Sequence, residues 1–276
     1  MSGTITTQQR AVLVVASLAV GLAFLDETAV VTALRAIQAD LGLSSLELQW
    51  VMGAYLLALA SLMAAAGRLA DVHGRRRTFL FGAAIFAVGS AVCALAPTAG
   101  VLIGGRGVQG VGAALVVPLG YANATLVVPE ERRGWALGIV STGATVFLAA
   151  GPVLGGLLTQ VFGWRSVFAV NLLPILVVGV VAARWMPESH LERREAIDVA
   201  GLVLLVCGLA AMTTALLQVQ SWRWVVTAAT AAVAIVCMRV RLPSASHWFA
   251  RVHRTKCGRW TSCSTALPVA ERSSVW

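Results

Sequence analysis

The chain has 276 residues, of which 58% are hydrophobic and 12% are charged, with a formal net charge of +9 and a mean hydropathy of +0.83. Because soluble globular proteins carry about 25% charged residues, this composition excludes an ordinary soluble domain and indicates an integral membrane protein. The basic residues lie in alternate short loops and in the C-terminal segment, not along one helix face. Membrane topology explains that distribution, and we expect no nucleic-acid partner.

Apolar runs of membrane-spanning length follow one another along the chain. A span needs about 20 apolar residues, and it must be helical because lipid offers no hydrogen-bond partners to the backbone. The sequence therefore predicts an all-α polytopic membrane protein. Eight spans are expected, at residues 12–35, 49–68, 78–96, 100–121, 135–158, 166–186, 199–217 and 224–238.

The basic residues also predict the orientation of the spans. With the N-terminus inside, ten basic residues before residue 239 fall in cytoplasmic segments, whereas three, Arg35, Arg165 and Arg223, fall in outside loops. Positive residues are enriched in cytoplasmic loops. We therefore expect an integral protein of the cytoplasmic (inner) membrane with both termini inside.

The longest polar break, at residues 187–198, divides the chain. Residues 1–187 are predicted to form an N-terminal six-helix bundle. Residues 188–238 would add a cytoplasmic linker and two further transmembrane helices. Residues 239–276 are polar and basic without an apolar run of span length, and we expect them to be disordered or an out-of-frame product.

Charged residues lie inside two predicted spans. An acid within a span costs about 2.5–3.5 kcal/mol on insertion scales, so Asp26 should face a protein interior or a watery cavity. The adjacent Glu27 points about 100° away around the helix and cannot face the same cavity equally. Asp26 and Arg106 lie about 15 Å and about 9 Å from the outer ends of their spans, and so in the same half of the bilayer. They are candidates for a proton-sensitive pair, and a purely structural ion pair is the alternative.

Glycines recur in the fourth and fifth spans. Three of them spell the dinucleotide-binding fingerprint, but no strand precedes them, so we interpret them as close helix packing: Gly105, Gly107 and Gly110, extended by Gly104 and Gly112. The fifth span carries a second set, which serves either packing or a bend that changes during transport: Gly143, Gly151, Pro152, Gly155 and Gly156.

The sequence shows no pattern of an enzyme or a metalloprotein. In the C-terminal segment, His253, Cys257 and Cys263 fit no zinc spacing well. No soluble-type nucleophile with a base is apparent. We therefore expect no catalytic residue, no metal site and no cofactor.

Several ordered stretches resemble signatures of the major facilitator superfamily. Residues 67–80 (GRLADVHGRRRTFL) match the loop signature between spans two and three, although Val72 stands where the family usually has arginine. The matching residues are Gly67, Asp71, Gly74, Arg75 and Arg76. Residues 102–114 match the span-four signature through Arg106, Gln109 and Gly110, and residues 143–156 match the span-five antiporter signature ending in GPVLGG. Residues 25–34 and 163–174 look like the fourteen-span drug:proton antiporter branch, with departures at Val31 and Arg35.

The resemblance implies an exporter of small molecules or drugs that works by proton antiport, with the proton gradient as its driving force. It further implies that Asp26 and Arg106 take part in proton coupling, that the 67–80 loop helps lock conformations, and that the first six spans form two inverted repeats. The family's second six-helix half is missing from this chain, which looks truncated after about eight spans. An inactive membrane remnant and a half-transporter completed by a second chain therefore stay open, and a sugar importer is disfavoured by the span-five signature.

Overall fold

The computed structural model describes residues 5–188, 207, 208 and 211, and this part of the chain is almost entirely helical. The helices are Thr7–Leu41 (α1), Ser45–His73 (α2), Arg75–Ala94 (α3), Ala99–Leu126 (α4), Arg133–Phe162 (α5), Arg165–Ala169 (α6) and Leu172–Trp185 (α7), with a 3-10 turn at Glu130–Arg132 (η1). Six segments are long and apolar enough to cross a membrane, and α6 and α7 together make the sixth.

The expected all-α membrane fold is thus confirmed, and six of the eight expected spans coincide with helices. The other two, at 199–217 and 224–238, lie outside the described residues. So does the segment 239–276, including His253, Cys257 and Cys263. The inverted relation of two three-helix repeats stays a prediction.

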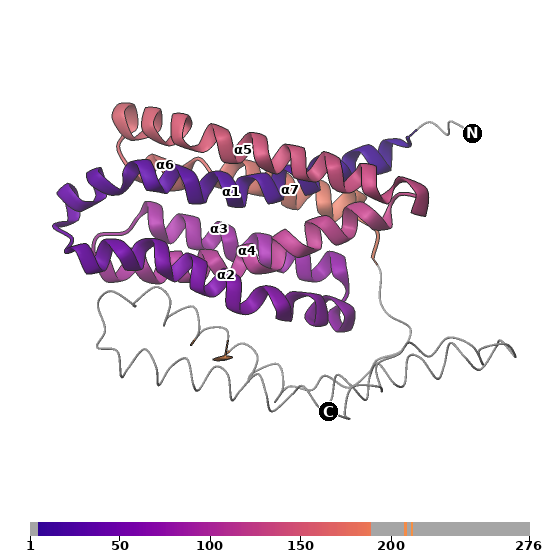
Figure 1. Ribbon diagram of the computed structural model, residues 1–276, viewed down its shortest axis with the longest axis horizontal. Coiled ribbons are helices and arrows are strands. Elements are labelled where there is room, and N and C mark those ends of the chain that lie inside the picture. The colour runs from indigo at the N-terminus through magenta and orange to yellow at the C-terminus, as the bar shows by residue number, and fades with distance from the viewer. Residues whose placement is uncertain (1–4, 189–206, 209–210, 212–276) are drawn as a thin grey trace, which may run out of the picture.

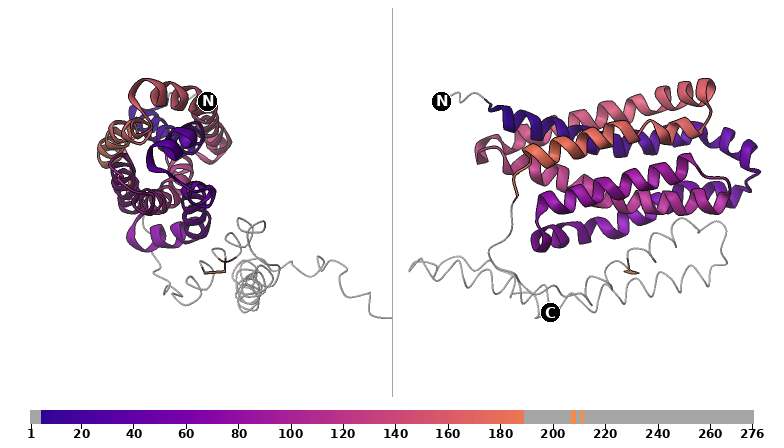
Figure 2. Two further views of the ribbon diagram at one scale, coloured as in Figure 1. Left: turned by 90° about the vertical axis from the view of Figure 1, so that its left-hand side faces the viewer. Right: turned by 180° about the vertical axis from the view of Figure 1, so that it is seen from behind.

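The helices form an elongated bundle (Figure 1). Of the candidate membrane spans, α1 and α4 are the most buried. Helix α1 packs chiefly against α5, and α4 packs against both α2 and α3, while α1 and α4 also touch each other. Seen from behind, the α6–α7 segment lies alongside α1 and α3 (Figure 2). Polar side chains placed midway along α1 and α4 are therefore surrounded by other helices.

Helices α1, α2, α4 and α5 extend beyond the predicted spans at both ends, and the starts of α1 and α2 are fixed by capping. Helix α1 begins at a capping box formed by Thr6 and Gln9, and α2 begins at a second box formed by Ser44 and Glu47. With 35 residues, α1 is about 52 Å long at 1.5 Å per residue, well over the roughly 30 Å of a hydrocarbon core. Both ends of α1 are thus expected to project from the apolar layer.

A single residue, Gly74, joins α2 to α3. Its φ of 95° lies in the region that favours glycine, because a side chain there would be strained. The 67–80 stretch is therefore not an extended loop: α2 continues to His73, and α3 starts at Arg75.

The predicted glycine packing in α4 is correct at some positions and wrong at others. A Cβ added to Gly110 would lie 2.5 Å from the Tyr55 carbonyl oxygen of α2, and one added to Gly105 would lie 2.7 Å from Cys93 Sγ of α3. Gly112 faces the Phe86 backbone of α3 just as closely. Gly104 and Gly107, in contrast, face open space, so they don't belong to this packed surface.

Candidate functional site

The two charged residues singled out in the sequence meet at the centre of the bundle. Asp26 of α1 and Arg106 of α4 both have side chains that are 0% exposed, and Arg106 Nη1 lies 2.5 Å from Asp26 Oδ2. A buried charge of this kind is tolerated only when it is paired and hydrogen-bonded. The structure therefore contains the expected ion pair, while its part in proton coupling stays a prediction.

Three more polar side chains complete this site. Gln109 donates from Nε2 to Asp26 Oδ1 (2.8 Å) and to Ser90 Oγ (2.9 Å), and its Oε1 accepts a hydrogen bond from Arg106 Nη1 (2.7 Å). Asn171, between α6 and α7, donates from Nδ2 to Asp26 Oδ1 at 2.6 Å. We call these five residues the Asp26 network: Asp26, Ser90, Arg106, Gln109 and Asn171. All five are buried, and they come from α1, α3, α4 and the sixth span.

The second helix holds Arg106 from another side. Arg106 Nε donates to the Val51 carbonyl oxygen at 3.1 Å, and its guanidinium carbon lies 4.2 Å from the centroid of the Tyr55 ring. A cation over an aromatic face is stabilised by the ring quadrupole, and more strongly when it is desolvated. Tyr55 is itself fixed by a hydrogen bond to the Ala23 carbonyl oxygen of α1. The arginine is thus positioned by four groups on three helices.

Glu27 does not join the network. It is half-buried, and within the described part of the chain it forms no hydrogen bond or ion pair. Its neighbour Asp26 is fully buried. The structure therefore separates the two adjacent acids as the helical geometry predicts.

Sequence reasoning missed the roles of Asn171, Ser90 and Tyr55. Asn171 stands in a stretch that resembles the antiporter branch, but it was not singled out there. A usable signal is its position three residues before Pro174, since proline cannot donate a hydrogen bond to the Val170 carbonyl and so breaks the span there. A polar residue at a proline-induced break within an apolar run is a reasonable candidate for a buried contact.

A second polar cluster lies at the α2–α3 junction, within residues 67–80, and it is more exposed than the Asp26 network. Asp71 and Arg75 form an ion pair at 3.5 Å, and Gly67 faces open space. The Arg76 guanidinium donates to the Ala183 carbonyl oxygen near the end of α7, and the Arg76 backbone N–H donates to Glu188 Oε1 at 3.3 Å. These contacts tie the junction to the sixth span of the same half.

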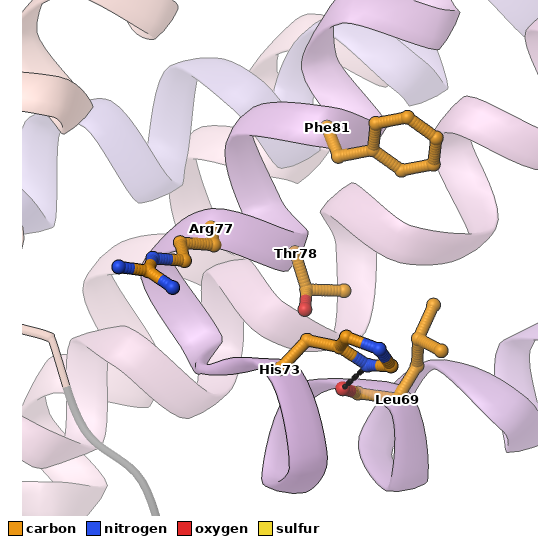
Figure 3. Close-up of a pocket in the computed structure, with 5 residues that line it drawn as sticks. All are labelled: Leu69, His73, Arg77, Thr78 and Phe81. Atoms are coloured by element: carbon orange, nitrogen blue, oxygen red, sulfur yellow. Dashed lines mark hydrogen bonds between the residues drawn. The ribbon is translucent and has the colours of Figure 1, made fainter.

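An open pocket of about 340 Å³ lies beside this junction. Figure 3 shows Leu69 and His73 of α2 on one side of it and Arg77, Thr78 and Phe81 of α3 on the other. Arg77 Nε lies 3.7 Å from Glu188 Oε2, so its charge is partly balanced. The pocket is far less enclosed than the Asp26 network and contains none of its residues.

The span-five residues pack against α1 next to the buried acid. A Cβ on Gly155 would lie 2.6 Å from Ala29 Cα, and one on Gly151 would lie 2.8 Å from Thr28 Cβ. The Thr28 hydroxyl donates to the Leu148 carbonyl oxygen at 3.2 Å. Pro152 is exposed, and α5 continues through it as one helix. The packing role is therefore seen at Gly151 and Gly155 and, against Ser17, at Gly143, whereas Gly156 faces open space.

Comparisons with known proteins agree with this architecture. The chain matches the Major Facilitator Superfamily over residues 16–269. It is 36% identical over 213 residues to the multidrug resistance protein Stp of Mycobacterium tuberculosis, covering 77% of this chain and 40% of that protein. It is 38% identical over 222 residues to the cephamycin export protein CmcT of Amycolatopsis lactamdurans, covering 79% of this chain and 46% of that protein.

A solved structure gives the same fold at low sequence identity. The crystal structure of PepTSo, a transporter of the POT family, superposes with a TM-score of 0.64 at 15% identity, covering 85% of this chain and 52% of that one. The chain spans less than half the length of the two curated relatives. From its sequence match and its helical architecture, the chain belongs to the Major Facilitator Superfamily.

Proposed function

We propose that this chain forms the proton-coupling half of an exporter that exchanges protons for small, drug-like molecules. The observation that carries the proposal is the fully buried Asp26, whose carboxylate accepts hydrogen bonds from Arg106, Gln109 and Asn171. Charge inside a membrane bundle is expensive, so a buried acid there is by default a candidate for a functional residue. Relatives named for multidrug resistance and cephamycin export support a drug-like substrate.

The geometry suggests how one proton changes the site. In the ionised state, Asp26 neutralises Arg106 and gathers three donors from α4 and the sixth span. A proton on Asp26 removes that charge, so Arg106 loses its counter-ion while keeping its contacts to Val51 and Tyr55. The interactions of Asp26 that join α1 to α4 and to the sixth span then weaken. Proton binding thereby favours a different helix arrangement, which is the requirement for antiport.

We further propose that the bundle lies in the cytoplasmic membrane with its N-terminus inside. Arginines at the α2–α3 junction, at the α4–α5 turn and at the end of α7 support this orientation, because positive residues favour the cytoplasmic side. The chain spans about 40% of the length of Stp, and we propose that a further six-helix half completes the substrate path.

The test uses everted membrane vesicles from an efflux-deficient host that produces this chain. An acridine dye reports the interior acidification, and a lipophilic cation such as ethidium is then added. We expect the cation to release protons from the vesicles with the wild-type chain and not with Asp26→Asn, while Asp40→Asn, which alters an acid at the exposed end of α1, behaves like wild type. No proton release, with the chain present in the membrane, would rule out antiport by this chain and support the inactive remnant. Cross-linking in the same vesicles distinguishes a dimeric half-transporter.

A further inference from the structure

We propose that Asn171 is a positioning residue that responds to the protonation state of Asp26 and thereby sets the pH at which this acid exchanges its proton. The inference rests on the proposed function, because it concerns the proton step of that transporter. Asn171 belongs to the sixth span, whereas the ion pair itself joins α1 and α4.

Asn171 is fixed at a break in the sixth span. It directly precedes Leu172, the first residue of α7, and its own carbonyl oxygen accepts from the Ile175 N–H at 3.1 Å. Its backbone N–H donates to the Phe168 carbonyl oxygen at 3.2 Å. The backbone on both sides is thus held, and the side chain reaches 2.6 Å from Asp26 Oδ1.

Only one end of the Asn171 amide is engaged. Its Nδ2 donates to Asp26, while its buried Oδ1 has no partner among the described residues. Gln109 differs, because its Nε2 donates to Asp26 and Ser90 while its Oε1 accepts from Arg106. Turning the Gln109 amide would break three hydrogen bonds. Turning the Asn171 amide would exchange one hydrogen bond for another.

This difference matters when Asp26 takes up a proton. An ionised carboxylate only accepts hydrogen bonds, whereas a protonated one also donates through its O–H. With the proton on Oδ1, the Asn171 Nδ2–H faces a donor, and a half-turn of the amide presents the unused Oδ1 as the acceptor. Asn171 can therefore serve both states of Asp26, and Gln109 is held in one orientation.

The charged form benefits more from Asn171 than the neutral form does. Hydrogen bonds to an ionised group are roughly twice as strong as neutral ones. Removing the amide should therefore favour the protonated acid and move the pH of half-protonation upward. Other groups in electrostatic range of Asp26 are Arg106 on α4, Glu27 on α1, Tyr55 on α2 and Cys93 on α3. Residues 134–162 of α5 and 166–183 of the sixth span contain no titratable side chain.

The test measures proton binding directly. The purified chain in lipid nanodiscs is titrated by infrared spectroscopy, and the carboxylic-acid band of Asp26 is identified by its loss in Asp26→Asn. We expect Asn171→Leu to raise the midpoint by about one pH unit, a roughly tenfold tighter hold on the proton. Asn123→Leu is the matched control, since Asn123 is equally buried and, among the described residues, bonds only to the Leu119 carbonyl oxygen of its own helix. It should leave the midpoint unchanged.

A second variant separates positioning from packing. Asn171→Asp keeps the shape, and its protonated form offers one donor and one acceptor as the amide does, whereas its ionised form repels Asp26. We expect proton-linked transport by Asn171→Asp at acidic pH and its loss at alkaline pH. An unshifted Asn171→Leu midpoint, an Asp26 band that does not titrate, or equal shifts in Asn171→Leu and Asn123→Leu would overturn the inference. A shifted midpoint without substrate-dependent proton release would uphold it and contradict the proposed function.

Discussion

Helix α1 carries two acid–arginine pairs that look alike in distance and differ in surroundings. Asp26 and Arg106 approach to 2.5 Å with both side chains 0% exposed, whereas Asp40 and Arg165 approach to 2.7 Å with 47% and 45% of their side chains exposed. Water can replace either partner of the outer pair, but nothing replaces a partner of the inner pair. Burial, and not the distance between the charged atoms, decides what each pair does for the fold.

The largest expected effect is the loss of stability when the inner pair is broken. Asp26→Leu leaves Arg106 buried without a counter-ion, so we expect the free energy of unfolding to fall by about 3–5 kcal/mol. Asp40→Leu should change it little, because the remaining Arg165 is solvated. Denaturant titration in detergent micelles, followed by circular dichroism, measures both.

The double variant sharpens this result. Asp26→Leu combined with Arg106→Leu removes both charges, and it should be less destabilised than the sum of the two single variants, with a coupling energy of up to about 3 kcal/mol. Equal losses for Asp26→Leu and Asp40→Leu would show that burial does not separate the two pairs.

An intermediate effect is expected from two glycines of α4, near the inner pair. An alanine Cβ at Gly110 would meet the Tyr55 backbone at 2.5 Å, so Gly110→Ala should destabilise the bundle by about 1–3 kcal/mol. Gly107 faces open space, and Gly107→Ala should be neutral or stabilising by up to about 1 kcal/mol. The same titration checks both. A larger loss at Gly107 than at Gly110 would place the packed face of α4 elsewhere.

The smallest effect is the response to salt. At 1 M salt the Debye length is about 3 Å, so exposed charges are screened while buried ones are not. We expect high salt to reduce the small stability difference between wild type and Asp40→Leu and to leave the difference between wild type and Asp26→Leu unchanged. A salt-sensitive Asp26→Leu difference would mean that water reaches the inner pair.

The sequence predicted the helices better than it predicted their ends. Apolar runs locate spans because lipid demands them, but α1 starts and stops where Thr6 and Gly42 cap it. The distances of Asp26 and Arg106 from the outer ends of their spans place both residues in the same half of the bilayer. For that reason their pairing could be predicted from the sequence.

Contacts that depend on helix rotation and packing were not predictable from spacing alone. Gly105 and Gly112, seven residues apart, face α3, whereas Gly107 faces open space, although all three are glycines of one apolar run. Asn171 reaches Asp26 from the interruption between α6 and α7, three residues before Pro174, where the sixth span packs against α1. Neither fact can be read from a hydropathy pattern.

The one-residue connection at Gly74 has a consequence for how the protein is made. With no loop to close, α2 and α3 are neighbours as soon as both are synthesised, and the entropy lost in bringing them together is small. The three arginines that follow Gly74 resist crossing the bilayer, so the turn should stay on the side where synthesis occurs. We therefore expect the second and third spans to enter the membrane together as one hairpin, with their opposite directions fixed at the moment of insertion.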